Sequence, residues 1–222
     1  MLPETVSRRV AVVAAAVFWP ALFAFAAAYP GYSHLHRAVS ELGAFGTPHA
    51  VAWNIIGFII PGLLLAVCGG RAALAIDGRR SLLFWLLVIS GLGFAGAGVF
   101  PAEMRNGIPR MQSPWTAGHV LMISLSGFPW VIAAFVLASR VRRSTRWRRL
   151  LPISLALAVV AFLGLGLNVF GRSIPMLADA PGLAQRLAFA VYFAWFLAVG
   201  ALFLANTGRR ACDRITSSCS GR

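Results

Sequence analysis

Six long apolar stretches, separated by short segments rich in arginine, proline and glycine, constrain the fold of this chain more than any other feature. A helix needs about 20 mostly apolar residues to cross the roughly 30 Å hydrocarbon core of a bilayer. The sequence therefore predicts an all-α polytopic membrane protein, a single transmembrane domain with six helices in one bundle. The predicted spans are residues 10–29, 51–70, 82–100, 115–138, 150–170 and 183–205, with a cytoplasmic tail of residues 206–222.

The composition agrees with a lipid environment. The chain is 59% hydrophobic and only 12% charged, whereas charged residues make up about a quarter of a typical soluble domain. A net charge of +14 would suggest nucleic-acid binding in a soluble protein. Here the basic residues occupy the gaps between apolar stretches, as they do in membrane proteins. We therefore expect membrane lipids as partners and no nucleic acid.

The distribution of arginines predicts the orientation. Positive charges in short loops resist translocation and so remain in the cytoplasm. Fifteen of the 20 basic residues, all of them arginine, fall on the side shared by both chain ends and the second and fourth loops. This asymmetry predicts an N-in, C-in protein of the bacterial inner membrane. The five arginines predicted on the outer side are Arg37, Arg105, Arg110, Arg172 and Arg186.

Polar groups gather toward the outer ends of the predicted spans. Such groups are costly within a bilayer and often mark functional sites. The outer set comprises His34, His36, His49, His119, Glu41, Glu103, Asp179, Asn54, Asn168 and Arg186. We therefore predict an outward-facing polar pocket that binds a ligand. The residues predicted to line it are Glu41, Asn54, Glu103, His119 and Arg186.

Helical spacing predicts which faces point inward. Ser126 lies seven residues after His119 and shares its face, which we expect to face the bundle interior. The first outer loop is the longest between spans, and residues 34–42 of it could form a short helix over the bundle mouth, ending at Gly43. The third span contains the pattern G-x-G-x-x-G, but no strand precedes it, so we expect these glycines to permit close helix contact.

Several motifs together resemble a known family. They are Tyr32-Ser33, Ser40-Glu41-Leu42-Gly43, Asn54, Phe100-Pro101-Ala102-Glu103, Gly118-His119 and Arg186. In this respect the chain resembles the bacterial membrane family known as domain of unknown function 998 (DUF998). The resemblance implies six spans and brings no activity with it. Glu103 stands where we expect aspartate in the family pattern, a departure that keeps the carboxylate.

Two of the predicted pocket residues are also candidates for catalysis. Glu103 and His119 could pass a proton or orient a water molecule, or they could form a buried hydrogen bond between the third and fourth spans. Arg186 could clamp a phosphate or carboxylate, pair with Glu41 or Glu103, or extend to the headgroup region.

A metal site and a serine hydrolase find less support. His34 and His36 would diverge on a helix, and no H-E-x-x-H or cysteine pairing accompanies them. Ser33 and Ser40 lack the sequence of a nucleophile elbow. We therefore predict no metal and no cofactor.

The leading functional prediction is an inner-membrane protein, of otherwise unknown activity, that binds a lipid headgroup or small amphiphile in its outer pocket. One alternative is a membrane-embedded hydrolase or transferase using His119 and Glu103. A transporter or a structural partner subunit is a further alternative, and the sequence leaves the oligomeric state open.

Overall fold

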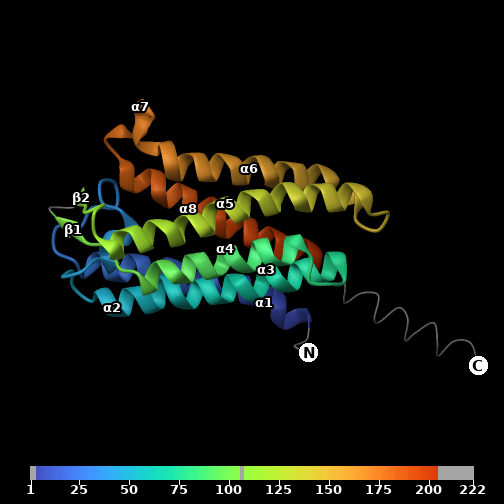
Figure 1. Ribbon diagram of the computed structural model, residues 1–222, viewed down its shortest axis with the longest axis horizontal. Coiled ribbons are helices and arrows are strands. Elements are labelled where there is room, and N and C mark those ends of the chain that lie inside the picture. The colour runs from blue at the N-terminus through green and yellow to red at the C-terminus, as the bar shows by residue number, and fades with distance from the viewer. Residues whose placement is uncertain (1–3, 106–107, 205–222) are drawn as a thin grey trace, which may run out of the picture.

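The computed structural model describes residues 4–105 and 108–204, and it shows a bundle of long helices lying side by side (Figure 1). Six helices are long and apolar enough to cross a membrane. The predicted all-α, six-helix fold is therefore confirmed, and the chain is a multi-pass membrane protein. The predicted cytoplasmic tail, residues 206–222, lies outside the described residues.

The second and the sixth of the six long helices each contain a π-helical turn. In chain order the six helices are α1 (Glu4–Ala27); a continuous helix made of α2 (Ala50–Trp53), the π-helical turn η2 (Asn54–Ile59) and α3 (Ile60–Asp77); α4 (Leu82–Val99); α5 (Pro114–Arg143); α6 (Leu151–Phe170); and α8 (Pro181–Val199) with the π-helical turn η5 (Gly200–Leu204). The helices α3 and α5 continue beyond the predicted spans, because a helix that has left the hydrocarbon need not be apolar.

Short elements connect these helices. They are η1 (Val39–Gly43), η3 (Arg148–Leu150), η4 (Gly171–Ser173), α7 (Pro175–Ala178), and the antiparallel pair β1 (Met104–Arg105) and β2 (Ile108–Pro109). The first loop, the β1–β2 pair and α7 lie at the same end of the bundle (Figure 1). This is the end that the arginine pattern predicts to face outward, and we call it the outer end.

The first outer loop contains less helix than its sequence predicts. Only Val39–Gly43 is helical, as the 3-10 turn η1, and residues 34–36 form a turn. The reason is visible in the hydrogen bonds. The carbonyl of Leu35 accepts from the amides of Gly182 and Leu183, at 2.8 and 3.1 Å, so this carbonyl is used by α8 rather than by a local helix. The loop nevertheless lies across the outer end, as expected.

Close packing of α4 against its neighbours depends on glycine. A Cβ added to Gly93 would lie 2.5 Å from the backbone nitrogen of Ser126 in α5, and one added to Gly91 would overlap the backbone of Ala66 in α3. Small residues at such positions let transmembrane helices approach closely. The G-x-G-x-x-G pattern is therefore a helix-packing feature, as the sequence analysis predicts.

The helix α6 is held to the bundle along only part of its length. Its buried residues are all small: Ser154, Ala158, Ala161 and Gly164. After Gly164, no residue of α6 is buried. Just after the helix, Gly171 is buried against α8, where an added Cβ would lie 2.6 Å from Cβ of Ala184. The outer half of α6 is less buried than its inner half, and space remains between it and α5.

Candidate functional site

A pocket of about 510 Å³ lies in this space, between the outer halves of α5, α6 and α8 and beneath the first outer loop and the β1–β2 pair. We call it the outer pocket. Its polar lining comprises His36, Ser40, Glu41, Thr116, His119, Ser124, Asn168 and Gln185. Its apolar lining includes Met111, Val120, Ile123, Phe128, Leu167 and Val169. One end of the pocket is therefore polar, and the walls toward the bundle centre are largely apolar.

The outer pocket opens sideways between α5 and α6. Val120, Phe128 and Val169 line it, yet these side chains are 42%, 54% and 51% exposed on the outside of the bundle. They lie on helices that are long and apolar enough to span a membrane. Lipid would therefore contact the rim of this opening.

His119 is buried in the wall of the outer pocket, as its helical position predicts. Its Nδ1 lies 2.9 Å from the carbonyl oxygens of both Ala97 and Phe100 at the end of α4. A carbonyl oxygen can only accept, so Nδ1 carries the hydrogen and Nε2 is the acceptor nitrogen of the neutral ring. His119 thus ties α4 to α5 and still offers one nitrogen to a ligand.

Glu41 is buried in the roof of the same pocket. Its carboxylate Oε1 lies 3.4 Å from Nη1 of Arg37, which is partly exposed. Burial raises the pKa of the Glu41 carboxyl above its ordinary value, and the positive charge of Arg37 opposes this shift. The loop therefore presents a carboxylate to the pocket.

Arg186 is buried at the outer end of α8 but is not among the residues that line the outer pocket. Its Nε donates to Nδ1 of His34 at 3.0 Å, and its Nη2 donates to the hydroxyl of Tyr32 at 2.7 Å. Its Nη1 donates to the carbonyls of Arg37 and Gly182, at 2.9 and 2.7 Å. These contacts fasten the first outer loop to α8. Among the described residues, neither Glu41 nor Glu103 forms an ion pair with this guanidinium.

Asn54 also holds the loop. Its Nδ2 donates to the carbonyl of Gly43 at 2.9 Å, and Asn54 begins the π-helical turn η2. A Cβ on Gly43 would overlap the Asn54 side chain, so the contact requires glycine there. Asn54 is buried and does not line the outer pocket.

Glu103 faces a different, shallower pocket of about 360 Å³, which is lined by Phe45, Glu103, Met104, Arg110 and Trp115. Its carboxylate is partly exposed and lies 3.3 Å from Nη1 of Arg110. Of the five residues predicted to line one pocket, the structure therefore brings together Glu41 and His119. Asn54 and Arg186 support the roof, and Glu103 lies beside the site.

Several residues that belong to the site were not predicted from the sequence. Gln185 accepts a hydrogen bond from the Val39 amide through Oε1 at 2.6 Å, and it lines the outer pocket. Thr116 accepts from the Glu103 amide at 2.9 Å and also lines the pocket. Gln185 is adjacent to Arg186 and Thr116 lies one turn before His119, so helical spacing could have indicated both.

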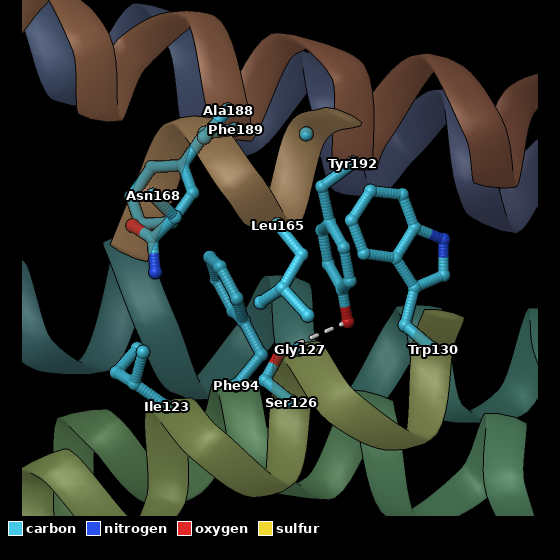
Figure 2. A pocket seen from close by; sticks show the side chains of 11 residues that line it. Phe94, Ile123, Ser126, Gly127, Trp130, Leu165, Asn168, Ala188, Phe189 and Tyr192 are labelled. Atoms are coloured by element: carbon cyan, nitrogen blue, oxygen red, sulfur yellow. Dashed lines mark hydrogen bonds between the residues drawn. The ribbon is translucent and has the colours of Figure 1, made fainter. Parts of the chain in front are cut away.

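A smaller pocket of about 30 Å³ extends the outer pocket toward the middle of the bundle, and the two share Ile123 and Asn168. Figure 2 shows its lining, including Tyr192 and Ser126, which a hydrogen bond joins. The Tyr192 hydroxyl also lies 2.9 Å from Oγ of Ser90. Three buried hydroxyls therefore meet near the centres of α4, α5 and α8.

Metal ligation receives no support from the described residues, among which no group of three histidine, cysteine, aspartate or glutamate side chains could hold an ion. His36 instead directs Nδ1 to the carbonyl of Asp179 at 2.6 Å.

Comparison with known proteins identifies a family but no activity. No curated protein and no solved structure matches the chain. The family described as "Protein of unknown function (DUF998)" matches residues 12–202, which is most of the chain and all the elements that build the outer pocket. Of the motif residues noted in the sequence, Ser40, Glu41, Ala102 and His119 line that pocket. The chain therefore belongs to the DUF998 family.

Proposed function

We propose that this protein binds a lipid headgroup or small amphiphile in the outer pocket, within the bacterial inner membrane. One observation carries the proposal: the pocket is polar at its outer end, apolar toward the bundle centre, and open between α5 and α6 on the side that lipid would contact. An amphiphile could enter from the bilayer through this opening, with its head under the loop and its chain along α5.

The size of the outer pocket suits such a ligand. Its volume of about 510 Å³ lies within the roughly 300–1,000 Å³ typical of small-molecule sites. Along α5 the lining runs from Thr116 to Phe128. At 1.5 Å per residue this is about 18 Å of helix, long enough for a head and part of an alkyl chain.

The five residues selected from the sequence have different roles in this proposal. Glu41 and His119 contact the head of the ligand. Asn54 and Arg186 hold the loop that covers it, through Gly43 and through the Tyr32–Arg37 segment. Glu103 lies beside the entrance.

A pair of matched variants tests the proposal. Val120 and Ser124 line the outer pocket one helical turn apart, whereas Leu121 and Leu125 lie on the same helix outside that lining. The Val120→Trp, Ser124→Trp double variant should narrow the pocket from its open side. The Leu121→Trp, Leu125→Trp double variant adds the same side chains where lipid would meet them.

Native mass spectrometry of protein released gently from membranes is the measurement. We expect an amphiphile adduct on the wild type and on the Leu121→Trp, Leu125→Trp control, and its loss from the Val120→Trp, Ser124→Trp variant. An adduct that persists in the pocket variant, or no adduct on any of the three folded proteins, would overturn the proposal.

His119 supports a second function, a membrane-embedded hydrolase or transferase. With Nδ1 held by two carbonyls, Nε2 could act as a base toward a bound ligand. Glu103 faces another pocket, so it would act only after the β1–β2 segment moved. Chemical conversion of the bound amphiphile by the wild type, with a pH dependence that His119→Gln abolishes, would select this function.

A further inference from the structure

We infer that the amphiphile bound in the outer pocket has a positively charged head that donates hydrogen bonds, as a protonated amine does. The inference rests on the proposed function and concerns the chemical class of its ligand. It comes from the polar groups that the pocket presents. The pocket holds one carboxylate, that of Glu41, and two imidazole rings, those of His36 and His119.

Both rings present an acceptor to the ligand. His36 contacts the carbonyl of Asp179 through Nδ1 at 2.6 Å, and His119 contacts two carbonyls through Nδ1 at 2.9 Å. Carbonyl oxygens cannot donate, so in each ring Nδ1 must carry the hydrogen. In the neutral form of each ring, Nε2 is then the acceptor nitrogen. With the Glu41 carboxylate, three acceptor groups line one pocket.

The Glu41 carboxylate can still bind a ligand. Its Oε1 lies 3.4 Å from Nη1 of Arg37. A carboxylate offers about four lone-pair sites, so a further donor can be accommodated. Arg37 is partly exposed and also stacks on the ring of Tyr29, with its guanidinium carbon 5.1 Å from the ring centre.

An anionic head would meet no arginine among the described side chains that line the outer pocket. The sequence suggests Arg186 as a phosphate clamp, but its guanidinium donates hydrogen bonds to His34, Tyr32 and two backbone carbonyls. Among the described side chains, a phosphate or sulfate would therefore meet the Glu41 carboxylate and the rings of His36 and His119.

A bare metal ion fits less well than an organic head. Within the described residues, no three of the candidate ligand side chains are close enough to hold one ion. Ser40, Thr116 and Gln185 add neutral hydroxyl and amide groups along the same wall. Hydroxyl and amide groups can donate as well as accept, and Gln185 Oε1 already accepts from the Val39 amide, so this wall suits an organic head with several polar atoms and one positive charge.

Three probes with the same chain separate the possible heads. Dodecylammonium, dodecyl phosphate and dodecyl glucoside carry a cationic, an anionic and a neutral head. Saturable binding of each radiolabelled probe would be measured by equilibrium dialysis against the wild-type protein in phosphatidylcholine nanodiscs, with protein-free nanodiscs as background. Glu41→Gln removes the carboxylate charge, and Asp77→Asn removes a carboxylate charge at the opposite end of the bundle, far from the outer pocket.

We expect wild type to bind dodecylammonium at least about tenfold more tightly than either other probe. Glu41→Gln should weaken dodecylammonium binding about tenfold, because hydrogen bonds to a charged group are stronger than those to a neutral one. Asp77→Asn should bind as wild type does. Tighter binding of the phosphate or glucoside, or unchanged ammonium binding in Glu41→Gln, would overturn the inference.

A second variant covers the case in which Glu41→Gln fails to fold. His36 is exposed at the rim, and His36→Arg would replace an acceptor by a fixed positive charge. Ammonium binding should weaken and phosphate binding should strengthen, whereas an unchanged order of the two probes would contradict the inference. If no probe binds saturably, the proposed function itself fails, because all three share the chain that the apolar wall should accept.

Discussion

The guanidinium Nε of Arg186 donates a hydrogen bond to Nδ1 of His34 at 3.0 Å, across 152 positions of sequence. The contact joins a buried cation in α8 to a neutral ring in the first outer loop. The other donors of Arg186 meet the Tyr32 hydroxyl and the carbonyls of Arg37 and Gly182. One side chain thus holds the roof of the outer pocket in place.

Replacing Arg186 by glutamine should release the roof. The change leaves several partly buried acceptors without donors, at about 1–3 kcal/mol for each unsatisfied group. We expect a clear fall in thermal midpoint in nanodiscs and faster hydrogen exchange in residues 32–43. Arg110→Gln, which breaks the exposed pair with Glu103, should change stability by only about 0–1 kcal/mol. Equal effects of the two substitutions would contradict this role for Arg186.

Acid should loosen the same roof through His34. Burial, and then the charge of Arg186, lower the pKa of His34 below its ordinary value of 6.5. Below pH 6.5, His34 takes up a proton when the loop is released from Arg186 but not when the loop is bound to it. The loop is therefore held fully above about pH 6.5, and its attachment weakens as the pH falls toward the lowered pKa of His34. The other groups facing the ring are Tyr32, at 5.6 Å between ring centres, and Phe23, at 5.3 Å.

Hydrogen exchange of residues 32–43 between pH 7.5 and 5, corrected for its intrinsic pH dependence, is the measurement. His34→Gln keeps an acceptor for Arg186 without a titrating ring, so its protection should vary less with pH. His36→Gln should behave as wild type does. If protection in His34→Gln depends on pH as strongly as in wild type, another titrating group causes the effect.

Two glycines offer a test of helix packing. In Gly93→Ala the new Cβ would lie 2.5 Å from the backbone of Ser126, so α4 and α5 must separate, which we expect to cost about 1–3 kcal/mol. A Cβ on Gly166 in α6 meets nothing within 4 Å. Gly166→Ala should therefore be neutral or slightly stabilising, because alanine favours helix. Thermal unfolding of both variants would check this, and equal midpoints would contradict it.

The predicted orientation can be tested independently of any ligand. A green fluorescent protein fused after Arg222 should fluoresce, and alkaline phosphatase fused there should be inactive, if the tail is cytoplasmic. The reverse pattern would place the outer pocket on the cytoplasmic side. The pocket geometry would be unchanged, but the source of its ligand would differ.

Individual residues show which features of the site could be predicted from the sequence and which could not. His119 and Ser126 share an inward face because a helix repeats every 3.6 residues, and both are buried as predicted. Arg186 was selected because it is an ionisable residue within a predicted span. Its partners could not be deduced, because Tyr32, His34 and the Arg37 carbonyl come from a loop whose path depends on α8.

The six helices could be predicted from the sequence, because the length and apolarity of each stretch are local properties and lipid offers the backbone no hydrogen-bonding partners. The sequence also predicted that polar groups gather at one end. Which polar groups share a pocket depends on the tertiary structure. Space remains between α5 and the outer half of α6, so Glu41 and His119 line a cavity together, while Arg186 is turned toward the loop and Glu103 toward Arg110. These placements depend on how separate helices pack, and no single stretch of sequence carries that information.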